Sequence, residues 1–266
     1  MRRLSLAATA VSILLTGVAA AADLPAYTKA SPPPAVIYDW TGFYLGANAG
    51  GIWGGGRSTL VDFTSDGYDP GPTLTSSRSS SWVAGVHGGH NWQTASRIVL
   101  GIEGDFEFAS HSHSNSGPLL AAGAPFLNSL SNVSDRLNWL ASARGRLGYA
   151  VGSFMPYITG GSAVSETRYS GYVTNGFGLA VSGPYSETRA HTGWVAGAGA
   201  EYMASPNWIF RAEYLHYAFG GERIVGATNP GFVAGARGVF TLGGTTYDTV
   251  RAGVSYKFGG PTAANY

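Results

Sequence analysis

The feature that most constrains the fold of this chain is a two-residue alternation of side-chain character that recurs in eight segments. In "RLNWLASARGRLGYA", Trp139, Ala141 and Ala143 fall at one parity, whereas Arg144 and Arg146 fall at the other. Successive side chains of a β-strand point to opposite faces, so this period predicts strands with one apolar and one polar face. The segments lie near 40–53, 81–93, 97–109, 137–151, 155–165, 191–203, 207–219 and 246–258.

The connections between these segments alternate in length. Short turns are expected at 94–96, 152–154 and 204–206. Long polar loops are expected at about 54–80, 110–136, 166–190 and 220–245. Outer-membrane barrels have this asymmetry, with short periplasmic turns and long extracellular loops, and strands of ~9–11 residues suffice to cross the bilayer. The pattern predicts an all-β fold, an eight-stranded antiparallel up-and-down transmembrane β-barrel.

The two faces of the predicted strands differ in charge. We expect the apolar face of every strand to be free of charged residues, because Arg or Lys facing lipid at the midplane costs ~2–4 kcal/mol. The other parity assigns these charged residues to the lumen: Glu103, Asp105, Glu107, Arg144, Arg146, Glu201, Arg211, Glu213, Arg251 and Lys257.

An eight-stranded barrel has an interior just wide enough for side chains to fill. Buried charges there must pair, because an unpaired ion is costly at low dielectric. We predict that Arg144 and Arg146 plug the lumen and fix strand register. A gated, charge-selective eyelet is the alternative interpretation of the same residues.

A soluble barrel or sandwich with its apolar face inward would give the same alternation. Two features of the composition and pattern favour the membrane barrel. Only 12% of residues are charged, against about 25% in soluble domains. Aromatic residues also occur at both ends of the apolar faces, where interfacial girdles belong. The predicted girdle consists of Trp82, Trp92, Trp139, Tyr149, Trp194, Tyr202, Trp208, Tyr256 and Phe258.

The N-terminus has the pattern of an export signal, which also favours the membrane barrel. Arg2 and Arg3 precede an apolar stretch over 4–18, and three alanines at 20–22 fit a cleavage site. The apolar stretch is shorter than the ~20 residues of a spanning helix, the alternative interpretation. The expected organisation is a signal peptide (1–22), a Pro-rich periplasmic linker (23–38), the outer-membrane barrel (39–260) and a C-terminal tail (261–266).

Several functions are disfavoured. A net charge of +1 without a basic cluster argues against nucleic acid as a partner. The absence of cysteine excludes disulfides and thiolate metal sites. His111 and His113 in the second long loop could bind a metal or haem iron, but no third ligand is near, so we expect no metal and no cofactor. No G-x-S-x-G motif occurs and parity places no histidine beside a candidate serine nucleophile, so we expect no enzyme activity.

Several motifs resemble a known family. They include "DWTGFYLGANAGG" (39–51), "LGIEGDFEF" (100–108), "ARGRLGYA" (143–150), "RAEYLHYAFG" (211–220) and "VRAGVSYKFGG" (250–260). They are similar to porin-family outer-membrane proteins of alpha-proteobacteria, which have an OmpA-like membrane β-barrel of the opacity or surface-antigen type. Members commonly end on the aromatic residue of the last strand, whereas "GGPTAANY" follows Phe258 here. His90, where the family pattern suggests tyrosine, and His216 are expected on the lipid face.

The resemblance implies a surface-exposed envelope protein of the Gram-negative outer membrane. The primary expectation is a structural component with a charge-plugged lumen. A small diffusion porin is one alternative, and a haem-binding or host-contact protein acting through its long loops is another. Expected partners are outer-membrane lipid, lipopolysaccharide and the barrel-assembly machinery.

Overall fold

The computed structural model describes residues 38–63, 73–74, 79–117, 120–121, 124–125, 130–174, 180–226 and 238–259. The expected signal peptide, nearly all of the linker and the tail lie outside these residues. Within the part of the chain that the structure describes, no helix is long and apolar enough to span a bilayer. The strands are β1 (Gly42–Phe63), β2 (Thr73–Leu74), β3 (Ser79–Gln93), β4 (Ile98–Gly117), β5 (Leu120–Ala121), β6 (Ala124–Pro125), β7 (Leu130–Tyr149), β8 (Phe154–Thr174), β9 (Ala180–Met203), β10 (Trp208–Phe219), β11 (Glu222–Gly226) and β12 (Gly238–Lys257).

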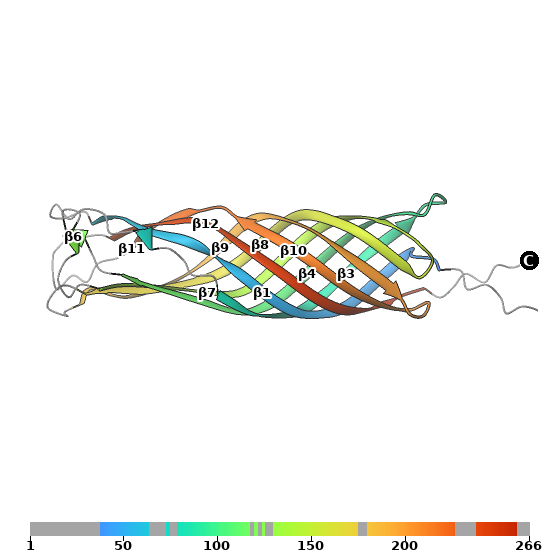
Figure 1. Cartoon of the computed structure of the whole chain (residues 1–266), viewed down its shortest axis with the longest axis horizontal. Coiled ribbons are helices and arrows are strands. Elements are labelled where there is room, and N and C mark those ends of the chain that lie inside the picture. Colours follow the sequence, from blue (N-terminus) through green and yellow to red (C-terminus); the bar gives the residue numbers. More distant parts are fainter. Residues whose placement is uncertain are drawn as a thin grey trace, which may run out of the picture. The chain divides into compact units, whose positions relative to one another are not determined.

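Eight long strands form a closed antiparallel barrel. The order β1, β3, β4, β7, β8, β9, β10, β12 is a meander, and β12 pairs back with β1 from Tyr44↔Lys257 to Phe63↔Gly238. Closure leaves no open edge among these strands, which a sheet inside a bilayer requires. Figure 1 shows the strands running obliquely around one axis, as barrel closure demands. The predicted fold is confirmed.

The three tight turns lie at one end of the barrel, as expected. They connect β3 to β4, β7 to β8 and β9 to β10 over 94–97, 150–153 and 204–207. Backbone hydrogen bonds connect this end of the barrel: Ala150 N donates to Arg97 O of the neighbouring turn at 2.8 Å, and Met203 N at the end of β9 donates to Ser153 O at 2.8 Å. These bonds fix the short-turn end of the barrel.

The strands are longer than the alternation suggested. β4 continues to Gly117 and β7 begins at Leu130, so much of the predicted loop 110–136 is strand. β8 and β9 likewise extend through most of 166–190. Register shifts between Phe108 and His111 and between Leu137 and Trp139 explain the error, because a β-bulge interrupts parity without ending the ladder.

The outward face is apolar over a broad band. Ile102, Phe108 and Ile158 are each about 60% exposed, which is usual for a lipid-facing surface and unusual for one in water. Of the nine expected girdle residues, Trp139 is half-buried, with its ring 5.5 Å from that of Phe106. The other eight are exposed: Trp82, Trp92, Tyr149, Trp194, Tyr202, Trp208, Tyr256 and Phe258.

The expectation that no charge occurs on the apolar face is wrong at Asp248. This carboxylate accepts a hydrogen bond from Tyr214 Oη at 2.6 Å and lies 2.8 Å from His216 Nδ1. Tyr214 and His216 both lie on the outward face. The His216 ring also packs on Trp194 at 5.6 Å. Trp194 is one of the aromatic residues expected in the interfacial girdle, and the cost of a lipid-facing charge on which the expectation rested applies at the bilayer midplane.

His90, like His216, lies on the outward face as expected. Its ring packs between those of Phe43, at 5.0 Å, and Trp92, at 4.5 Å. The last ladder bond beside it joins Phe258 N to Phe43 O at 2.8 Å, so strand pairing ends on the aromatic residue Phe258.

Candidate functional site

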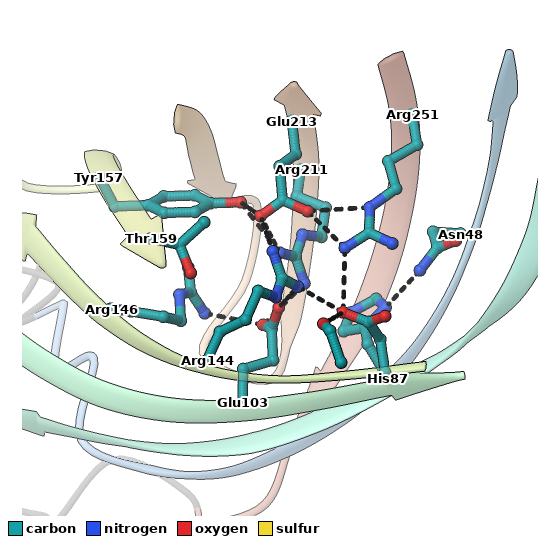
Figure 2. Close-up of polar contacts among 12 residues, drawn as sticks. Asn48, His87, Glu103, Arg144, Arg146, Tyr157, Thr159, Arg211, Glu213 and Arg251 are labelled. Atoms are coloured by element: carbon teal, nitrogen blue, oxygen red, sulfur yellow. Dashed lines mark hydrogen bonds and ion pairs between the residues drawn. The ribbon is translucent and has the colours of Figure 1, made fainter. Parts of the chain in front are cut away.

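The candidate site is a buried network of charged side chains in the middle of the barrel (Figure 2). The register of neighbouring strands pairs residues of opposite charge: Glu103 with Arg144, Glu201 with Arg211, and Glu213 with Arg251. Such cross-strand pairs stabilise an antiparallel sheet. The network, as used below, consists of Glu103, Asp105, Glu107, Arg144, Arg146, Glu201, Arg211, Glu213 and Arg251. All nine residues are buried.

Glu103 on β4 is the acidic centre of one half of the network. Arg211 approaches it with Nη1 at 2.8 Å and Nη2 at 3.0 Å, a two-pronged contact. Arg146 Nη1 lies 3.2 Å from it, and Arg144 Nη2 also donates to it. Tyr44 Oη donates to the same carboxylate at 2.7 Å. One carboxylate therefore contacts three guanidinium groups from two different strands.

Glu213 on β10 is the centre of the other half. It accepts from Arg144 Nη1 at 3.0 Å, from Arg211 Nη2 at 2.9 Å and from Arg251 at 2.6 and 2.8 Å. Tyr157 Oη adds a fourth donor at 2.9 Å. Figure 2 shows these side chains converging from opposite walls of the barrel. The shared arginines join the two halves into one network.

The remaining carboxylates have fewer partners. Arg251 contacts Glu107 and lies 3.3 Å from Asp105, which Arg144 also approaches at 2.7 Å. Glu201 pairs with Arg146 at 2.6 Å. The network thus holds five carboxylates (Glu103, Asp105, Glu107, Glu201, Glu213) and four guanidiniums (Arg144, Arg146, Arg211, Arg251), a formal excess of one negative charge.

Lys257 is buried in the barrel but does not join the network. Its Nζ donates to the backbone oxygens of Asp39 at 2.5 Å and Thr41 at 3.2 Å. The alternation correctly predicts that Lys257 faces the lumen, but it does not predict the position of this residue along the barrel axis. Its partner is the segment that precedes the first strand.

That segment closes the short-turn mouth of the barrel, which the sequence did not predict. Trp40 was expected to begin the first strand, but β1 starts at Gly42, where φ is +132°. Trp40 is fully buried: its Nε1 donates to Gly152 O at 3.2 Å, and its backbone N donates to Gln93 Oε1 at 2.8 Å. It packs in an apolar layer, the mouth layer, with Val99, Ala150, Met155, Tyr157, Met203 and Ile209.

A second apolar layer lies on the long-loop side of the network. It includes Leu137 and Leu140, both turned inward across the bulge in β7, together with fully buried Tyr217 and Tyr247. We call it the upper layer; its members are Ile52, Val83, Ala109, Leu137, Leu140, Ala163, Val195, Leu215, Tyr217, Phe219 and Tyr247. The charged network is therefore enclosed between two apolar layers.

The expectation that no histidine lies beside a serine is wrong. His87 Nε2 is 2.7 Å from Ser255 Oγ, and its Nδ1 is 3.2 Å from Asn48 Nδ2. Gly46 lies between His87 and Ser255 in register, and a Cβ there would approach both polar atoms within 2.7 Å. Because Asn48 Nδ2 donates to Nδ1, His87 carries its proton on Nε2 and donates to Ser255, the reverse of a general-base arrangement.

His111 and His113 lie in β4, not in a loop as expected. His111 is fully buried, with its ring 5.6 Å from that of Tyr247 in the upper layer. The side chain of His113 lies outside the described part of the structure. Among the residues that the structure describes, no group of three or more His, Cys, Asp or Glu side chains could hold a metal ion.

Comparison with known proteins agrees with this architecture. The model of the outer membrane protein beta-barrel domain family matches residues 8–258. The chain belongs to this family. It is 31% identical over 257 residues to a 31 kDa outer-membrane immunogenic protein of Brucella melitensis biotype 1, covering 93% of the chain and 99% of the relative. A 25 kDa outer-membrane immunogenic protein of Brucella abortus biovar 1 is 27% identical over 269 residues, covering 97% and 100%.

Among solved structures, Neisserial surface protein A shares 14% sequence identity with a TM-score of 0.41, covering 82% of this chain and 98% of that one. The alpha-proteobacterial resemblance seen in the sequence is confirmed by the family and the relatives. The chain is an outer-membrane protein, and the apolar band of the barrel is its lipid-facing surface.

Proposed function

We propose that this chain is a structural, surface-exposed component of the outer membrane whose lumen does not conduct. One observation carries the proposal: a network of paired charges lies between two apolar layers. The side chains of its arginines and carboxylates are at most 2% exposed.

Permeation would have to break this arrangement. A passing ion would separate guanidinium groups from carboxylates such as Glu103 and Glu213, leaving charges unpaired in a low-dielectric interior. Removing one partner of a buried pair costs ~3–5 kcal/mol, and each centre has several partners. The mouth layer and the upper layer add apolar constrictions, which exclude water from a narrow pore.

The same packing argues against catalysis in the lumen. His87 and Ser255 are each only 1% exposed, and their hydrogen bond runs in the wrong direction for activating the serine. The relatives carry the name of immunogenic outer-membrane proteins, which fits a role at the cell surface. We infer that the exterior and the long-loop end, rather than the lumen, carry any activity toward partners.

The rate at which proteoliposomes swell in small sugars and amino acids distinguishes a closed barrel from a diffusion porin, because swelling reports solute entry. Vesicles with the refolded wild-type barrel should swell no faster than protein-free vesicles, while vesicles with a large general porin provide the positive control. Solute entry that increases with the amount of folded barrel would overturn the proposal. The heat-modifiable mobility of the barrel on gels shows that it is folded.

A further inference from the structure

Two arginines lie directly opposite each other on the outer surface of the barrel. Arg136 on β7 and Arg168 on β8 are register partners, and both side chains are exposed. Their neighbours Leu137, Thr167 and Tyr169 point inward and are buried, which fixes the outward orientation of the pair.

A like-charged pair in this position is unfavourable by itself. Directly opposite residues have Cβ atoms ~4.5–5.5 Å apart, and like charges at that spacing destabilise a sheet. Within the described part of the chain neither arginine forms an ion pair; Arg168 Nε donates to Ser186 Oγ at 2.8 Å. Glu166, which precedes Arg168 by two residues on β8, accepts a hydrogen bond from Asn138 Nδ2 at 3.1 Å.

Hydroxyl groups continue the row on both sides. Ser112 on β4 is the register partner of Arg136, and Thr188 on β9 is the partner of Arg168, and both are exposed. The row Ser112–Arg136–Arg168–Thr188 therefore presents two guanidinium groups flanked by two hydroxyls across four adjacent strands. This set of donors suits an anion with several oxygens.

The height of the row matches the headgroups of the outer leaflet. Arg168 follows Phe154, an exposed aromatic residue at the short-turn end, by fourteen residues along β8. At ~3.3 Å per residue and a tilt of ~40° the row lies ~35 Å above that end, about 10 Å beyond an apolar band of ~25 Å. Trp139, only three residues from Arg136, lies at the boundary between the two regions.

We propose that Arg136 and Arg168, with Ser112 and Thr188, bind a phosphate group of an outer-leaflet glycolipid. The phosphate removes the repulsion between the two cations, and each planar guanidinium can donate two parallel hydrogen bonds to its oxygens. This site lies outside the lumen, so it does not depend on whether the lumen conducts.

The proposal can be tested by measuring lipid binding to the refolded barrel in neutral detergent. The barrel is titrated with bisphosphorylated lipid A and, separately, with the same lipid after dephosphorylation. Wild type should prefer the phosphorylated form, and added salt should reduce that preference. The double variant Arg136→Gln/Arg168→Gln should bind it at least tenfold more weakly. Arg136→Lys/Arg168→Lys should fall between, because lysine keeps the charge and loses the two-pronged geometry.

Arg97→Gln is the matched control, since it removes an exposed positive charge at the opposite end of the barrel. The Arg97→Gln variant should bind bisphosphorylated lipid A with the same affinity as wild type. Equal affinity for the two lipids, or an equal loss in the Arg97→Gln control, would overturn the proposal. So would binding of a soluble sulfated polysaccharide without binding of lipid A, because the site would then recognise a different partner.

Discussion

Two acidic residues in the network allow its energetics to be tested with one chemical change. Glu103 is contacted by three arginines and Tyr44, whereas Glu107 is contacted by Arg251 alone among the guanidiniums. Both carboxylates are buried, and both lie on β4 four residues apart. Replacement by glutamine removes the charge at nearly constant volume.

The two variants should differ strongly in stability. Glu103→Gln removes ionic contacts with Arg144, Arg146 and Arg211 at once, and although each keeps another carboxylate, breaking a buried pair costs ~3–5 kcal/mol. Either variant removes the formal excess of one negative charge, but Glu107→Gln changes the contact with one guanidinium only, that of Arg251, which keeps Glu213 at 2.6 Å. We therefore expect Glu107→Gln to lose about 1 kcal/mol or less, close to one ordinary hydrogen bond.

Urea unfolding of the two variants in lipid vesicles, followed by tryptophan fluorescence, provides the free energies. The slopes with urea must match those of wild type for the comparison to hold. Equal losses for the two variants would refute the argument, because stability would then depend on burial of the side chain and not on its number of charged partners.

Three further predictions concern the mouth layer, the strand register and the lipid-facing surface. Trp40→Ala should cost ~3–5 kcal/mol in the same unfolding assay, because it empties a fully buried position in the mouth layer; a change below 1 kcal/mol would mean that the mouth is not packed. Gly46→Ala should prevent heat-modifiable folding, since a Cβ would lie 2.4 Å from Val254 O, whereas Gly51→Ala, with its nearest contact at 3.8 Å, should fold; two folded variants would contradict the register. Ile102→Arg should cost ~2–4 kcal/mol if this 59%-exposed side chain faces lipid, and no loss would place it in water.

Parity was sufficient to assign the inner and outer faces, because side-chain direction in a strand depends only on position along the chain. The inward positions of Glu103, Arg144 and Arg251 and the outward position of Trp194 follow from it directly. Parity gives no height along the axis and no partner across the lumen. Arg144 meets Glu213 from a strand that is not its neighbour, and such a contact depends on barrel closure and tilt.

Two kinds of local structure could not be predicted from alternation. The bulges beside His111 and Trp139 shift parity, so the alternation predicts loops where the structure has polar continuations of the strands. Trp40 lies in no strand, and its buried position arises from a fold-back that ends at Gly42. The expectation of an uncharged outer face rests on the cost of a charge at the bilayer midplane, and Asp248 lies instead beside His216, which packs on Trp194, a residue of the expected girdle.

We propose that the paired charges close the lumen. We would test this closure by single-channel recording in planar bilayers. The refolded mature wild type is compared with the double variant Arg144→Ala/Arg146→Ala. Wild type should show no conductance steps, while its gel mobility and its protection from protease show that it is folded and inserted. Steady ohmic steps in wild type, with an ion selectivity that changes in the double variant, would contradict the account and show that ions pass through the network.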